Sequence, residues 1–150
     1  MLLANVVWPA LILEGRLLTW WAIAAGLAAE FVALRYRLGL TSRVALRADL
    51  LMNAVSTAAG VVLIPLAGIA WEFFPGLILY PVLQVGTFNP VTWVATCLLA
   101  ALVNAGVEGA VLRMAFGVRF HRVVFLSLFV ANMASVGLAF ASLSAMPVRT

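Results

Sequence analysis

The sequence lacks lysine altogether and has one cysteine, one histidine and few charged residues, and each shortage excludes a class of site. Cys97 stands alone, so neither an intramolecular disulfide nor a cysteine-based metal site can form. The single histidine, His121, excludes a bis-histidine haem and a multi-histidine metal site within this chain. We therefore expect neither a metal nor a cofactor.

The usual signatures of an enzyme are also missing. No serine, cysteine or threonine has a histidine base at a recognisable spacing, and the sequence has no glycine-rich phosphate loop and no aspartate-rich metal motif. An enzyme is therefore not expected. A lipid-modifying enzyme stays open only because a membrane-embedded glutamate can serve as a base.

What the sequence has in abundance is apolar residues. They make up 66% of the 150 residues, against 9% charged, a balance that is typical of an integral membrane protein. The net charge of +4 comes from nine arginines, which lie between apolar runs and not on a continuous solvated face. That distribution argues against nucleic-acid binding and favours contact with lipid headgroups.

The apolar runs predict an all-α protein with about four transmembrane helices. Spanning the hydrocarbon core takes roughly 20 residues of helix. The segments that meet this length are residues 17–36, 44–67, 91–116 and 123–145. Residues 2–13 and 75–85 are apolar but too short, so we expect them at the membrane interface, within an aromatic belt that includes Trp71 and Tyr80.

The arginines predict the orientation. Most of them flank the two tight turns between predicted helices, together with the histidine: Arg35, Arg37, Arg43, Arg47, Arg113, Arg119, His121 and Arg122. By the positive-inside rule both turns face the cytoplasm and both termini lie outside. The short, alanine-rich chain with arginine as its only strong base favours a bacterial inner membrane.

The two predicted hairpins match each other in sequence. The motif E-x3-L-R-x3-G occurs twice, as Glu30, Leu34, Arg35, Gly39 and as Glu108, Leu112, Arg113, Gly117. With one inserted residue, Asn53-x-x-Ser56 then meets Asn132-x-x-Ser135. We expect one membrane domain, residues 1–150, built of two tandem units at about 8–67 and 74–145. Each unit crosses the membrane twice, so the repeat is parallel.

Each unit is predicted to hold a buried polar cluster. A carboxylate inside the bilayer costs several kcal/mol unless it is paired, hydrogen-bonded or protonated. The expected members are Glu30, Asn53 and Ser56 in the first unit, and Asn104, Glu108, Asn132 and Ser135 in the second. Two interpretations stay open: a polar site or proton-linked path inside the bundle, or interhelical hydrogen bonds that only fix the register of each hairpin.

Asp49 receives a different interpretation. It follows Arg43 and Arg47 near the predicted cytoplasmic interface. We therefore expect a local cluster of compensating charges there and do not place Asp49 in the intramembrane site.

With its paired motifs, Glu30 to Asn53-x-x-Ser56-Thr57 and Glu108 to Asn132-x-x-Ser135, the chain resembles small multi-pass bacterial membrane proteins of unassigned function. The resemblance implies a helical membrane fold and no mechanism. Two main functional hypotheses follow. The first is a non-enzymatic accessory or scaffolding subunit that binds a larger membrane protein. The alternative is a small oligomeric transporter or channel in which Glu30 and Glu108 bind a proton or a cation.

Overall fold

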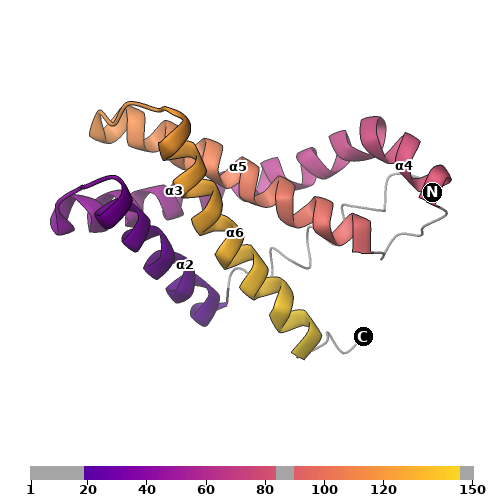
Figure 1. The fold of residues 1–150 in the computed structure, drawn as a ribbon, viewed down its shortest axis with the longest axis horizontal. Helices are drawn as coiled ribbons and strands as arrows, with labels where there is room; N and C mark the ends of the chain where they lie inside the picture. The colour runs from indigo at the N-terminus through magenta and orange to yellow at the C-terminus, as the bar shows by residue number, and fades with distance from the viewer. Residues whose placement is uncertain (1–18, 84–89, 146–150) are drawn as a thin grey trace.

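The computed structural model describes residues 19–83 and 90–145, and within these ranges every regular element is a helix (Figure 1). The elements, in chain order, are α2 (Trp20–Val32), η2 (Ala33–Arg37), α3 (Ser42–Trp71), η3 (Glu72–Gly76), α4 (Leu77–Leu83), α5 (Pro90–Phe116) and α6 (Arg122–Ala145). The two η elements are short π-helical turns that continue directly from the preceding α-helix. The predicted short segment at residues 2–13 lies outside the described residues.

Three helical runs among the described residues are long and apolar enough to cross a membrane: Ser42–Val82, Val91–Phe116 and Arg122–Ala141. The protein therefore fits an integral membrane protein. These runs contain most of the predicted spans 44–67, 91–116 and 123–145. The first predicted span, residues 17–36, corresponds to α2 and η2. These two elements are not among the three runs, because they carry Glu30, Arg35 and Arg37.

Residues 75–83 do not form a separate segment, because α3 continues through η3 into α4, and residues 84 and 85 lie outside the described residues. Proline lacks an N–H group, and at Pro75 the hydrogen-bond ladder shifts into a π-helical turn without ending the helix. The run Ser42–Val82 has 41 residues, or about 60 Å of helix at about 1.5 Å per residue. This is about twice the thickness of a hydrocarbon core, so a straight crossing cannot accommodate all of it.

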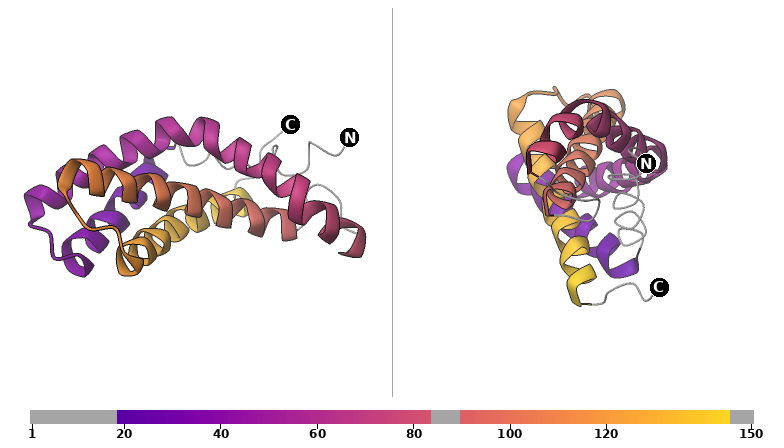
Figure 2. Two further views of the ribbon diagram at one scale, coloured as in Figure 1. Left: turned by 90° about the horizontal axis from the view of Figure 1, so that it is seen from above. Right: turned by 90° about the vertical axis from the view of Figure 1, so that its right-hand side faces the viewer.

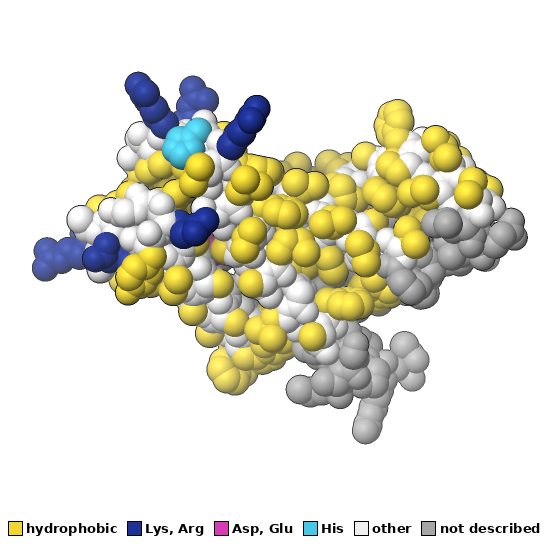
Figure 3. Space-filling view, in the orientation of Figure 1, with side chains coloured by type: hydrophobic (Ala, Val, Ile, Leu, Met, Phe, Trp, Pro, Cys, Tyr) yellow, Lys and Arg dark blue, Asp and Glu magenta, His cyan; other side chains and the backbone are white. Residues whose placement is uncertain are grey.

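Both interhelical turns have the same glycine conformation. Gly39 and Gly117 have φ values of 67° and 66°, in the left-handed region that glycine adopts without steric cost. Each glycine is followed by a hydrogen bond of 3.2 Å back across the turn, Leu40 N–H to Leu34 O in one and Val118 N–H to Leu112 O in the other. The described arginines gather at the end of the molecule that holds both turns (Figure 3).

The helices pack unequally. α3 lies along α5, α5 packs against α6, and α2 packs mainly against α6, while α2 and α3 touch little (Figure 2). The main core gathers apolar residues from η2, α3, α5 and α6: Leu34, Ala45, Ala48, Met52, Ala105, Val111, Leu112, Val124 and Leu128. The alanines at this core let helix backbones approach closely, which is how membrane helices gain packing energy.

Tyr80, expected in the interfacial aromatic belt, is instead buried against the start of α5. Its hydroxyl accepts a hydrogen bond from Trp71 Nε1 at 3.1 Å and one from the Thr92 hydroxyl at 3.4 Å. A buried phenol hydroxyl needs hydrogen-bond partners, and Trp71 and Thr92 supply them here.

Candidate functional site

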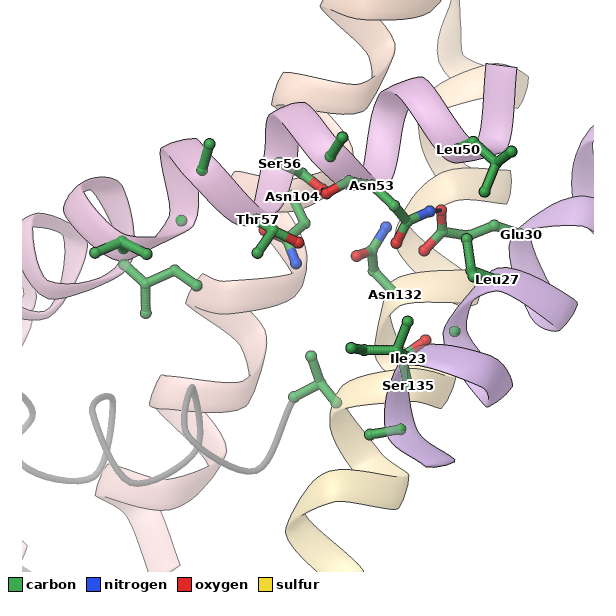
Figure 4. A pocket seen from close by; sticks show the side chains of 18 residues that line it. Ile23, Leu27, Glu30, Leu50, Asn53, Ser56, Thr57, Asn104, Asn132 and Ser135 are labelled. Carbon is green, nitrogen blue, oxygen red and sulfur yellow. Dashed lines mark hydrogen bonds between the residues drawn. The ribbon is translucent and has the colours of Figure 1, made fainter. Parts of the chain in front are cut away.

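The first glutamate of the repeated motif bonds to the asparagine of the next helix. Glu30 on α2 is only 2% exposed, and Asn53 Nδ2 on α3 donates to its Oε2 at 2.5 Å. The same Nδ2 lies 3.0 Å from the Asp49 backbone oxygen, one turn earlier in α3. Figure 4 shows the Glu30 and Asn53 side chains pointing toward each other.

The second glutamate has the same arrangement. Asn132 Nδ2 on α6 donates to Glu108 Oε2 on α5 at 2.7 Å, and it lies 3.1 Å from the Leu128 backbone oxygen. Each asparagine therefore bridges a glutamate of the preceding helix and a carbonyl one turn back in its own helix. Both glutamates and Asn132 are buried.

The structure places the two predicted clusters in contact, whereas the sequence analysis treated each as local to its own hairpin. The Ser56 hydroxyl on α3 interacts with the Glu108 carboxyl on α5, and the Glu108 carboxyl acts electrostatically on that of Glu30. Gly26 on α2 lies so close to α6 that an added Cβ would be 3.2 Å from Ser135 Oγ. The polar side chains thus form one group at the centre of the bundle.

Asp49 belongs to this group, which corrects its assignment to a surface charge cluster. It is buried, Asn53 Nδ2 lies 3.2 Å from its Oδ1, and its carboxyl also interacts with that of Glu30. Arg43 and Arg47 are exposed and are not among the groups that act on Asp49. The overlooked signal was helical spacing, because residues 49 and 53 lie on one face of a helix.

A cavity of about 470 Å³ adjoins the polar group. Six of the seven predicted cluster residues line it, together with Thr57: Glu30, Asn53, Ser56, Asn104, Asn132 and Ser135. Glu108 does not line the cavity and lies behind Asn132, its hydrogen-bond partner. In Figure 4, Glu30, Asn53 and Asn132 gather at one end of this space, and Asn104 and Thr57 lie farther along it.

The cavity opens sideways between α2 and α3. Ile23 on α2 and Leu50 and Val61 on α3 line it and yet are 45%, 52% and 54% exposed. These side chains therefore form its rim. The opening lies where the two helices of the first hairpin make few contacts with each other.

The basic residues predicted to flank the turns stay outside the site. All seven described arginines and His121 lie at or near the turns, and most of these side chains are exposed (Figure 3). Arg35 is half-buried and donates to the Leu40 carbonyl at 3.3 Å. No arginine is among the groups that act on Glu30 or Glu108, so the described residues supply no basic counter-charge to these carboxyls.

No protein-family model, curated protein or solved structure matches this chain. Within residues 19–83 and 90–145, no three histidine, cysteine, aspartate or glutamate side chains are placed to hold a metal ion. The chemistry of the site must therefore be argued from its own groups: three buried carboxyls, two bridging amides and two hydroxyls beside an open cavity.

Proposed function

We propose that the protein is a small multi-pass transporter or channel, oligomeric in the membrane, in which Glu30 and Glu108 bind a proton or a cation. The observation that carries the proposal is the presence of three buried carboxyls that act on one another, those of Glu30, Asp49 and Glu108, while no arginine of the described residues acts on the glutamates. A group of buried acids in a membrane protein is costly unless protons or cations compensate the charge.

The adjoining cavity supports a ligand more than a purely structural role. Hydrogen bonds that only hold two membrane helices together need no space beside them, and each contributes about 0.6 kcal/mol on average. Here the polar side chains line an open cavity of about 470 Å³. Its lining comes from four helices, α2, α3, α5 and α6.

The proposal includes four crossings arranged as two parallel repeats, with α2 and η2 as the first crossing. Matching glycine turns and matching asparagine bridges in the two hairpins support the repeat. The gathering of arginines at the turns supports cytoplasmic turns, outside termini and a bacterial inner membrane. The resemblance to small bacterial membrane proteins agrees with that location.

A flux experiment tests the proposal. The chain is reconstituted into vesicles, and proton, Na⁺ and K⁺ movement is recorded with entrapped dyes for the wild type, Glu30→Gln and Glu108→Gln. Glutamine keeps the size and a hydrogen-bond acceptor but removes the charge, so we expect flux to fall at least tenfold with little change in unfolding temperature. Thr96→Val, which changes a buried hydroxyl outside the cavity lining, is the control and should keep its flux. Wild-type vesicles that move none of these ions, with glutamine variants that only lose thermal stability, would contradict the proposal.

An accessory subunit is the second candidate, and the length of the Ser42–Val82 run favours it. This run is about twice as long as the hydrocarbon core is thick, and its far part exposes Phe74, Ile78 and Val82 at about 70% each. A larger membrane protein would cover such a surface. Native mass spectrometry of the protein in particles cut from its own membrane distinguishes the two candidates. A stable complex with a larger protein supports the accessory role, and a homo-oligomer or a monomer excludes it.

A further inference from the structure

The cavity beside the polar group has both polar and aliphatic lining residues. Glu30, Asn53 and Asn132 gather at one end, here called the polar end, and Leu27 and Leu50 lie beside Glu30 (Figure 4). Ile23 and Leu50 reach the protein surface. A volume of about 470 Å³ lies within the range of about 300–1,000 Å³ that is usual for small-molecule sites. It is far larger than the roughly 30 Å³ that one water molecule occupies, so a bare ion would leave most of it empty.

The polar end favours a positively charged, hydrogen-bond-donating group. Glu30 reaches the cavity directly, Asp49 interacts with it from behind, and Glu108 adds a third acid nearby. Ammonium groups donate short, strong hydrogen bonds to carboxylates, and they offset the cost of burying these acids. A phosphate or carboxylate ligand would be repelled, because the groups that act on the two glutamates include acids and no base.

The opening between α2 and α3 indicates how such a ligand would enter. The rim residues Ile23, Leu50 and Val61 are aliphatic and exposed. Leu50 and Val61 belong to the run Ser42–Val82, which is apolar enough to cross a membrane. A molecule with an apolar body can reach this rim from the hydrocarbon without crossing a polar barrier. A hydrophilic cation would have to leave water first.

We propose that the cavity between α2 and α3 binds a lipophilic amine, with its ammonium group at Glu30 and its apolar body against Ile23, Leu27 and Leu50. This inference rests on the proposed function and names the class of cation that the site takes. Asn53 and Asn132 then act as positioning residues, because their amides hold the two glutamate carboxyls in place.

Binding of a chosen amine to the full chain in nanodiscs of zwitterionic lipid tests the proposal. The probe is radiolabelled dodecylamine, and radiolabelled dodecanol, with the same chain and no charge, is the matched ligand control. We expect saturable binding of the amine and none of the alcohol. Glu30→Gln should weaken the binding of the amine at least tenfold.

Two further variants keep the test informative if Glu30→Gln folds poorly. Thr57→Phe places a ring in the cavity from an exposed position on α3, and it should also weaken binding at least tenfold. Val62→Phe adds the same ring to the same helix at a position that is 58% exposed and does not line the cavity, so its affinity should equal that of the wild type.

The outcomes separate this inference from the function on which it rests. Equal binding of amine and alcohol, or unchanged affinity in Thr57→Phe, overturns the amine site. Ion flux that depends on Glu30 without any amine binding leaves the transport proposal standing and removes the amine. Saturable amine binding that depends on Glu30, without flux of any ion, supports the site and contradicts transport of protons or inorganic cations.

Discussion

The segments α2 to α3 and α5 to α6 share their polar motif and differ in how tightly their helices pack. In both, an asparagine bridges a buried glutamate and a backbone carbonyl, and a left-handed glycine lies in the turn. α5 packs closely against α6, whereas α2 touches α3 little and lies against α6 instead. The same local motif thus joins two closely packed helices in one half and two loosely packed helices in the other, and the cavity borders residues of both.

The matched positions suggest the physical reason. In the alignment of the two repeated motifs, Ile23 and Leu27 on α2 correspond to Ala101 and Ala105 on α5. These alanines are fully buried. Small residues let helices approach each other, and larger aliphatic side chains hold them apart. In the same alignment Asp49 corresponds to Leu128. Only the first half therefore has a second acid near its glutamate. The side chains around each glutamate–asparagine pair therefore determine how closely its two helices pack.

Exchanging the acid and the leucine is expected to give the largest difference between the halves. Leu128→Asp puts a carboxylate into the main core, and the transfer of aspartate into a bilayer in place of leucine costs about 3–4 kcal/mol. Asp49→Leu should change the free energy of unfolding by less than about 1 kcal/mol, because Asn53 keeps Glu30 and the residue 49 backbone oxygen as acceptors. Reversible unfolding in mixed detergent measures both. Equal losses in the two variants would contradict the difference between the halves.

Exchanging large and small residues tests the packing difference. Ala105→Leu inserts three carbons into a fully buried position and should destabilise the protein by about 2–3 kcal/mol. Leu27→Ala, at the matched position, removes a side chain from the cavity wall and should cost about 1 kcal/mol or less. The same unfolding assay gives both values, and a larger loss for Leu27→Ala would mean that α2 packs as tightly as α5.

Removing the asparagines should distinguish the fully buried bridge of Asn132 from the half-buried bridge of Asn53. Asn132→Leu leaves Glu108 without its amide donor in a buried position, and we expect a loss of about 2 kcal/mol. Asn53→Leu should lose about 1 kcal/mol, because Asn53 is only half-buried and borders the open cavity. Thermal unfolding of the two variants, measured side by side, shows which loses more stability. A greater loss for Asn53→Leu would contradict the prediction.

The turns should show the smallest effects, and equal ones. Gly39→Ala and Gly117→Ala each place a Cβ in the left-handed region, at about 1 kcal/mol apiece, and neither Cβ would meet another atom within 4 Å. Unfolding temperatures that fall by the same amount would support equivalent turns. A clear difference between the unfolding temperatures of the two variants would show that the two turns are not equivalent.

Much of the fold follows from the sequence because its signals are local. Long apolar runs predict the membrane helices, and the glycine of E-x3-L-R-x3-G falls at each turn. The pairing of Glu30 with Asn53 and of Glu108 with Asn132 follows a repeated spacing, in which the glutamate lies 9 residues before the turn glycine and the asparagine 14 or 15 residues after it. The continuation of α3 through Pro75 does not follow, because proline is compatible both with a helix end and with a π-helical turn.

By itself, then, the sequence determined a membrane-compatible helical chain with two glutamate and asparagine pairs, because apolar length and residue spacing act within one helix or one hairpin. Only the tertiary structure decided that both pairs meet in one group, that Asp49 joins it and that a cavity opens between α2 and α3. These features depend on how the shapes of side chains on α2, α3, α5 and α6 fit together. No local periodicity encodes the packing of helices that are distant in sequence.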